Sequence, residues 1–286
     1  MYEKFYGLSE KPFALTPDPE FLYFGHHYKR ALLQMEYGLA NQAAFVLVTG
    51  EVGAGKTTLI RYLLGRLDKD LTVGVISNTS RDSGRLQQWV CSAYGLDGAG
   101  KDDVALYNMF IDFAIEEYAS GRRVVLIVDE AQNLGRNKLE ELRVLSNVNV
   151  DKHLVLQTIL VGQPELRDMM RTPQLRQFAQ RIGTDYHIGD LSEPETHSYV
   201  HHRLAVAGAT RSDIFTPMAV RLAHASSRGI PRLVNQLCDT ALVYGYAEQR
   251  EQIDAALMED VIRDRCAGGI FPGRRVEIAK GSAKTP

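Results

Sequence analysis

The stretch "GEVGAGKTTL", from Gly50 to Leu59, decides the fold, because it follows the apolar run "AFVLVTG" at 44–50 and begins a helical pattern. A glycine-rich turn is costly in conformational entropy, so it needs an occupant. Inward-facing backbone N–H groups, followed by the positive end of a helix, bind phosphate. The motif is a glycine, four residues and then Gly-Lys-Thr, here Gly50, Gly55, Lys56 and Thr57.

A chance glycine turn is the alternative interpretation, but a predicted strand before the loop and a predicted helix after it favour a nucleoside triphosphate site. We expect Lys56 to reach the β- and γ-phosphates and the Thr57 hydroxyl to coordinate Mg²⁺. The expected ATP-binding residues of the loop are Gly50, Glu51, Val52, Gly53, Ala54, Gly55, Lys56, Thr57 and Thr58.

A second acidic site follows the apolar run "RVVLIVDE" at 123–130. Asp129 lies where an open parallel sheet places its ligands, at the carboxyl end of a strand, and we expect it to hold Mg²⁺ together with Thr57. Glu130 is the candidate for polarising the attacking water. Two solvated acids at a strand end would look the same, but the phosphate loop upstream favours ATP hydrolysis.

Strand-like and helix-like segments alternate through the first two thirds of the chain. Near-continuous apolar runs rich in β-branched residues are typical of strands buried on both faces of a parallel sheet. We therefore expect an α/β fold, a three-layer sandwich with a central parallel sheet. The strand candidates are 44–50, 71–78, 123–130, 154–162 and, as a possible fifth, 184–191, with helical patterns at 57–67 and 139–148.

The pattern after Leu191 is helical only. "SEPE" at 192–195 is a capping box, and Thr216-Pro217, Pro231 and Asp254 mark three further helix starts. We expect a small all-α lid domain of about four helices. The expected divisions are an aromatic and proline-rich segment with a helix on the ATPase core at 1–43, the nucleotide-binding domain at 44–191, the lid at 192–266 and a disordered tail at 267–286.

The bulk composition excludes little. The net charge is −2, from 33 basic and 35 acidic residues. This bulk charge does not indicate binding to nucleic acid or to an anionic membrane. Three widely spaced cysteines suit a reducing compartment, and the N-terminus has no apolar core of a signal peptide. We expect a cytoplasmic protein that reaches the inner membrane only through a partner.

Further polar residues fit an ATPase that works between subunits. Gln163 follows the fourth strand, where it can sense the γ-phosphate or position water. Arg181 is a candidate arginine finger, with Arg176 as the alternative, and Arg232 in "GIPR" can report the γ-phosphate to the lid. Asn78 can hold Glu130 inactive or simply cap a turn. A surface salt bridge is the alternative role for each arginine.

These features in combination resemble AAA+ ATPases. More narrowly, "MYEKFYGLSEKPFALTPDPEFLYFGHHYKRAL", "TGEVGAGKTTL", "VDEAQNL" and "LVGQPEL" are similar to the general secretion pathway protein A family, which includes ATPases of exosortase/PEP-CTERM loci. The resemblance implies an ATP- and Mg²⁺-dependent homo-oligomer and a membrane-associated secretion or polysaccharide-export partner. It also implies adenine contacts from the segment before the loop, here Tyr23, Phe24 and His27, although packing on the core would explain them equally.

Three functions remain open at this point. The leading one is an ATPase that assists assembly or operation of a bacterial envelope secretion or exopolysaccharide export system. The family also resembles ATPases that assist transposition, so a DNA-binding ATPase is the alternative, with steeply salt-dependent DNA affinity as its mark. The third is a nucleotide-gated scaffold that does not hydrolyse ATP.

Overall fold

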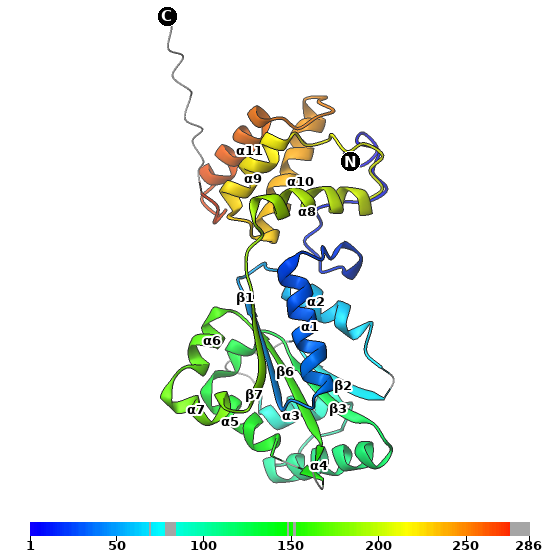
Figure 1. Cartoon of the computed structure of the whole chain (residues 1–286), viewed down its shortest axis with the longest axis vertical. Helices are drawn as coiled ribbons and strands as arrows, with labels where there is room; N and C mark the ends of the chain where they lie inside the picture. Colours follow the sequence, from blue (N-terminus) through cyan, green and yellow to red (C-terminus); the bar gives the residue numbers. More distant parts are fainter. Residues whose placement is uncertain (69, 78–83, 148, 151–152, 275–286) are drawn as a thin grey trace, which may run out of the picture. The chain divides into compact units, whose positions relative to one another are not determined.

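The computed structural model describes residues 1–68, 70–77, 84–147, 149–150 and 153–274, and the chain forms two compact units (Figure 1). The α/β unit comprises His26–Val52 and Lys56–Gly189. The helical unit comprises Met1–Gly25, Gly53–Gly55 and the chain from Asp190 onward.

The described part of the α/β unit is built on a five-stranded sheet in the order β2-β3-β6-β1-β7, and every neighbouring pair is parallel. β1, β3 and β6 lie inside the sheet and are almost entirely buried, as their apolar sequences predict. The strands are β1 (Phe45–Gly50), β2 (Leu71–Ile76), β3 (Arg123–Val128), β6 (Leu156–Gly162) and β7 (Ile182–Ile188).

Several elements have other bounds than the sequence pattern predicts. β3 stops at Val128, because Glu130 adopts a left-handed backbone with φ of 52° that no strand can continue. β2 stops at Ile76, and β7 runs from Ile182 to Ile188 in place of 184–191. The predicted helix at 139–148 is α5 (Gly135–Leu145). A short antiparallel pair that the pattern did not indicate follows, β4 (Asn149–Val150) and β5 (His153–Leu154).

Helices cover the sheet on both faces, which gives the predicted three-layer arrangement. α1 (His26–Ala40) packs on β1 and β7, and α2 (Lys56–Leu64) packs on β1. α3 (Leu86–Ala93) packs on β2, and α4 (Asp103–Ala119) packs on β3. The core includes Phe45 and Phe178, whose ring centroids are 4.3 Å apart. The remaining elements are η2 (Ala131–Leu134), α6 (Pro164–Met170), η3 (Pro173–Leu175) and α7 (Arg176–Ala179).

The helices of the helical unit begin at the predicted positions. Ser192 forms the capping box with Glu195, and the side chains of Thr216 and Asp254 accept hydrogen bonds from the first turns of their helices. Proline occupies the first turn of three of them. The helices of this unit in the described chain are α8 (Glu193–Val206), α9 (Pro217–Ser227), α10 (Pro231–Ala247) and α11 (Ala255–Ala267).

The N-terminal segment divides differently from the expected 1–43 block. Residues 1–25, with η1 (Pro19–Phe21), group with the helical unit, whereas α1 groups with the α/β unit. The reason is Arg203 of α8, which is 7% exposed and donates to the Pro12 and Ala14 carbonyls. Its guanidinium also lies 4.7 Å from the Phe21 ring centroid. Among the helices that the structure describes, none combines the length and apolarity needed to cross a membrane.

Candidate nucleotide site

The phosphate loop joins β1 to α2 and owes its shape to two glycines. Gly53 and Gly55 have φ of 84° and 81°, a conformation that L side chains rarely adopt. Lys56 begins α2 and is only 5% exposed, and its Nζ donates to the Gly50 and Glu51 carbonyls at 2.9 and 3.0 Å. Burial lowers the pKa of Lys56, and the nearby carboxylates oppose that lowering.

Thr57 and Asp129 meet beside the loop, although 72 residues separate them. The Thr57 hydroxyl donates to Asp129 Oδ2 at 2.7 Å, and Asp129 Oδ1 accepts the Glu130 backbone N–H at 2.9 Å. Asp129 is 5% exposed, and burial raises the pKa of its carboxyl while the Thr57 hydrogen bond opposes the rise.

This pair fits Mg²⁺ by its chemistry, because a hydroxyl and a carboxylate oxygen are hard donors. No group of three or more His, Cys, Asp or Glu side chains suited to a metal ion occurs in the described parts of the chain. A Mg²⁺ ion held by Thr57 and Asp129 would therefore complete its shell with nucleotide phosphates and water, as this ion commonly does.

Three residues from two chain segments form a closed ring of hydrogen bonds around Glu130. Glu130 Oε2 accepts from Gln132 Nε2 at 2.6 Å and from Gln163 Nε2 at 2.9 Å. The ring closes where the Gln163 backbone N–H donates to Gln132 Oε1 at 3.1 Å. Glu130 is thereby fixed by two amides next to Asp129, on a left-handed backbone of the kind that functional sites retain.

Gln132 is the functional candidate that sequence reasoning missed. It is 6% exposed, in η2 directly after the acidic pair, and a buried amide needs partners. Gly162 at the end of β6 makes room for it, since a Cβ there would lie 2.8 Å from Gln132 Oε1. The only sequence signal was the glutamine in "VDEAQNL" two residues after Glu130.

The two candidate arginine fingers have different environments. Arg181 donates to the Arg143 carbonyl at 3.1 Å, the Ser146 hydroxyl at 3.0 Å and the Asn147 side chain, so it caps the end of α5. Arg176 is exposed, and it makes no ion pair or hydrogen bond through its side chain with the described residues. It lines a cavity of about 600 Å³ together with Arg167 and Arg171. Asn78 lies outside the described residues.

The remaining predicted residues have neighbours within their own units. In the α/β unit, His27 Nδ1 lies 3.0 Å from the Tyr186 hydroxyl. In the helical unit, the Tyr23 ring packs against the rings of Tyr199 and His202, and Phe24 is half-buried.

Arg232 lies in the first turn of α10 and is exposed. Its backbone N–H donates to the Gly53 carbonyl at 3.2 Å, and a Cβ on Gly53 would lie 2.5 Å from Arg232 Cβ. Within the described chain the Arg232 guanidinium has no ion-pair partner.

The fold and the loop define the class of the protein. Residues 40–170 match the family described as AAA domain. A parallel sheet of this order, with a glycine loop after β1 and carboxylates after β3, gives the chain the P-loop fold of AAA+ proteins.

Solved structures share the fold at low identity. The TM-score is 0.66 to the Aeropyrum pernix ORC2 protein in its ADPNP and ADP complexes, at 15% identity over 94% of this chain and 73% of that one. It is 0.65 to the Aeropyrum pernix ORC1 protein in complex with DNA, at 16% identity over 91% and 72%. It is 0.53 to the Thermotoga maritima RuvB branch migration motor, at 15% identity over 89% and 73%. At these identities the likeness is one of fold.

A curated protein gives the narrower relation. The chain is 43% identical over 256 residues to General secretion pathway protein A from Aeromonas hydrophila, which is 88% of this chain and 46% of that protein. The chain is therefore a relative of General secretion pathway protein A and spans less than half of its length. This confirms the family resemblance, while the closer relation to exosortase-locus ATPases stays a prediction.

Proposed function

We propose that the chain binds ATP with Mg²⁺ and hydrolyses it to ADP and phosphate. The observation that carries this proposal is the Glu130 carboxylate, held by the Gln132 and Gln163 amides directly after the Thr57–Asp129 pair. A base next to a Mg²⁺ ligand and a phosphate loop is the arrangement that phosphoryl transfer to water requires.

Each residue has a role in that reaction. The loop N–H groups bind the phosphates, and Lys56 leaves its two carbonyl partners to contact the β- and γ-oxygens. Glu130 accepts the proton of the attacking water, and Gln163 positions that water or senses the γ-phosphate. Thr57 and Asp129 would hold Mg²⁺, which would supply positive charge to the phosphate oxygens. Water adds to the γ-phosphorus while the bond to the bridging oxygen breaks.

Further residues complete the proposed site in a homo-oligomer. The exposed, unpaired Arg176 suits action on a neighbouring subunit's nucleotide better than Arg181, which already caps α5. Arg232 reports the γ-phosphate to the helical unit, and Tyr23, Phe24 and His27 contact adenine. These roles rest on the family resemblance and on the exposure of the arginines.

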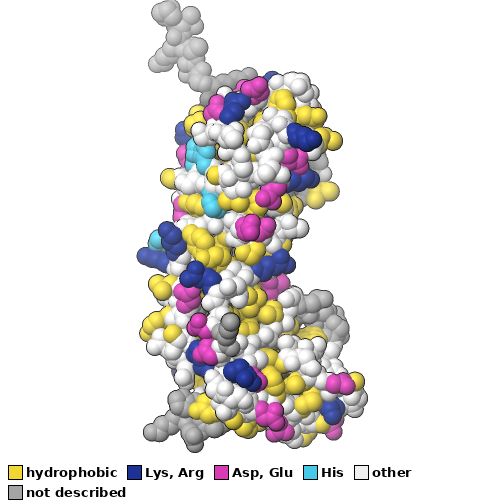
Figure 2. Space-filling model, turned by 90° about the vertical axis from the view of Figure 1, so that its right-hand side faces the viewer, with side chains coloured by type: hydrophobic (Ala, Val, Ile, Leu, Met, Phe, Trp, Pro, Cys, Tyr) yellow, Lys and Arg dark blue, Asp and Glu magenta, His cyan; other side chains and the backbone are white. Residues whose placement is uncertain are grey.

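The relative's name supports a role in secretion. The finer proposal, an envelope secretion or exopolysaccharide export system reached through a membrane-associated partner at the inner membrane, rests on the family resemblance. DNA binding is less favoured, because the net charge is −2 and no basic stripe is visible on the face in Figure 2, where acidic and basic side chains intermingle. The DNA named for one structural neighbour belongs to that protein.

The test measures nucleotide affinity and turnover separately, with a fluorescent ATP analogue and phosphate release. Wild type and Glu130→Gln should bind the analogue alike, while turnover should fall by about 10²–10⁴-fold in the variant. Glu259→Gln, an exposed acid on α11, is the matched control and should change neither. Binding without any wild-type turnover, alone or in oligomers, would leave only the nucleotide-gated scaffold.

The same Glu130→Gln protein, loaded with ATP, tests the DNA alternative. Labelled duplex DNA should show no binding at low or at physiological salt. Affinity that persists at physiological salt would move the assignment to a DNA-binding ATPase.

A further inference from the structure

Helix α4 has an outer face that does not match its position at the surface of the α/β unit. Its inner face is ordinary, with Leu106, Phe110 and Ala114 fully buried in the core. A surface helix normally carries polar residues opposite such a face. In α4, however, Val104 is 69% exposed and Ile115 is 40% exposed.

These exposed residues belong to one apolar strip. Val104, Tyr107, Ile111 and Ile115 follow one another at spacings of three and four, so they share a face of α4. Tyr107 and Ile111, in the middle of this face, are half-buried against the core. Val144 of α5 is 49% exposed and adds to them across the cavity described next. We call these five residues the α4–α5 strip. From Val104 to Ile115 it extends about 16 Å, which is about three turns of a helix laid against it.

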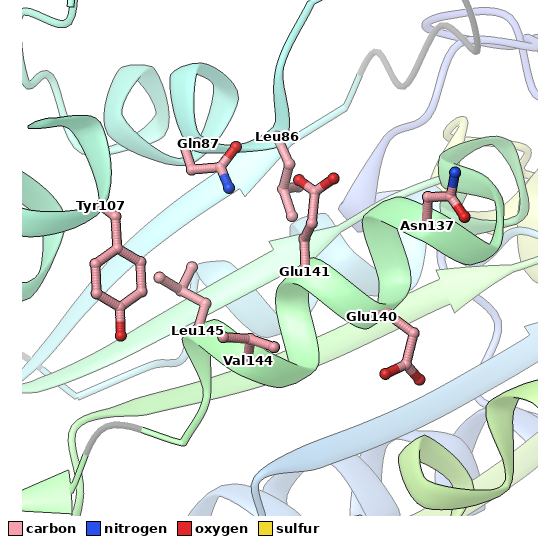
Figure 3. Close-up of a pocket in the computed structure, with 8 residues that line it drawn as sticks. All are labelled: Leu86, Gln87, Tyr107, Asn137, Glu140, Glu141, Val144 and Leu145. Atoms are coloured by element: carbon pink, nitrogen blue, oxygen red, sulfur yellow. The ribbon is translucent and has the colours of Figure 1, made fainter. Parts of the chain in front are cut away.

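A cavity of about 380 Å³ opens within the strip, between α3, α4 and α5 (Figure 3). Leu86, Leu145 and the strip residues Tyr107 and Val144 give it an apolar lining. Of the two glutamates in the lining, Glu141 extends toward Leu86, whereas the Glu140 carboxylate points away from Leu86 (Figure 3). A cavity of this size accepts one or two large apolar side chains, which is what anchors a helix in a groove.

The charge beside the strip has one sign. The sequence of α4 contains four acidic residues and no Lys or Arg, and the exposed Asp112 and Glu116 flank the strip. Glu141 supplies a third carboxylate from α5.

Of the three bases on α5, Arg136 is exposed and the other two are engaged. Arg143 Nε lies 2.7 Å from a Glu140 carboxylate oxygen, and Lys138 Nζ lies 4.2 Å from the Trp89 ring centroid. Among the described residues that line the cavity there is no Lys or Arg. The carboxylates around the strip therefore present a net negative rim.

We propose that the α4–α5 strip is a docking surface for a basic amphipathic helix of a partner protein, with apolar residues on one side and Lys or Arg beside them. An anionic membrane is a poor occupant, because Asp112, Glu116 and Glu141 would be repelled by its surface. A second copy is also disfavoured, since a two-fold contact through this face would bring the same acids together. This proposal does not depend on nucleotide hydrolysis.

The test uses a fluorescein-labelled Leu/Lys peptide of about 15 residues with leucines at helical spacing, and fluorescence anisotropy as the readout. The full chain should bind it, and should not bind a peptide in which every Lys is Glu. Val144→Asp and Glu141→Lys should each weaken binding by about tenfold or more, as central interface substitutions do. Circular dichroism checks that both variants remain folded.

Two matched substitutions in the helical unit control for general attraction of a cationic peptide. Val243→Asp replaces a valine that is 39% exposed, and Glu259→Lys reverses an exposed charge. Both should change the affinity less than about twofold. Equal weakening by control and strip variants, or absence of binding by wild type, would overturn the proposal. Sedimentation showing that Val144→Asp breaks a dimer would assign the strip to a second copy instead.

Discussion

Replacing Gln132 with alanine opens the ring around Glu130. The change removes the 2.6 Å hydrogen bond to the Glu130 carboxylate and the 3.1 Å hydrogen bond from the Gln163 backbone N–H. A hydrogen bond to a charged group contributes about 1.5–3 kcal/mol and a neutral one about 0.5–1.5 kcal/mol. Because Gln132 is 6% exposed, both contributions count, and the free energy of unfolding should fall by about 2–4.5 kcal/mol.

The chain carries a convenient reporter for this measurement. Trp89 is the one tryptophan in the sequence, and it lies in α3 of the same unit as Gln132. Its fluorescence in a urea titration therefore follows unfolding of the α/β unit. Gln163→Ala should cost less than Gln132→Ala, since it removes only the side-chain bond to Glu130. The exposed Gln174 is the control, and Gln174→Ala should change stability by less than about 0.5 kcal/mol.

Turnover gives the second measurement. Gln132→Ala should lower kcat by at least about tenfold, the effect of about 1.4 kcal/mol on a barrier, while affinity for the ATP analogue stays within about threefold. A Gln132→Ala protein as stable as the Gln174→Ala control would refute the argument that this ring fixes Glu130.

Four other outcomes are expected. Lys56→Ala should weaken binding of the ATP analogue by about tenfold or more, because a cation facing the phosphates is lost. Burial raises the pKa of Asp129, so the native state takes up this proton at higher pH than the unfolded state, and stability declines as pH rises through that pKa; Asp129→Asn should remove this decline and raise the urea midpoint at pH 7 without nucleotide. Hydrogen bonds from Arg122 and Thr72 lower the pKa of Glu117 to about 2, so their contribution is present above the ordinary value of 4.5 and is lost as pH falls toward 2; Arg122→Met should flatten the urea midpoint against pH in that window. Arg181→Ala should lower thermal stability through the end of α5, whereas Arg176→Ala should leave stability unchanged and reduce turnover only where oligomers form.

Local chemistry predicted much of the molecule. The helix starts at Ser192, Thr216 and Asp254 followed from capping side chains, whose effect acts within one turn. The phosphate loop was predicted from a motif whose spacing fixes a backbone shape. Asp129 was predicted from its position at the carboxyl end of an apolar run. The order of the strands did not follow, because periodicity identifies a buried strand but not its neighbours.

What the sequence left open depends on contacts between distant segments. Gln132 and Gln163 share one carboxylate only because β3 and β6 are neighbours in the sheet. Arg181 was predicted as an arginine finger because the sequence does not show that its guanidinium lies within hydrogen-bond distance of the end of α5. The sequence of the aromatic N-terminal segment does not predict its packing against α8, since Arg203 lies 191 residues from Pro12.

The attachment of that segment sets an order in time during synthesis. Tyr2 donates to Asp239, 237 residues later, and Tyr6 donates to the Arg250 carbonyl, 244 residues later. The chain needed for the α/β unit is complete by Gly189, long before these acceptors leave the ribosome. Residues 1–25 are made before the helices of the helical unit, so they must wait for those helices before they can pack against them. During this interval the rings of Tyr2 and Tyr6 lack the helical partners that bury them in the folded chain.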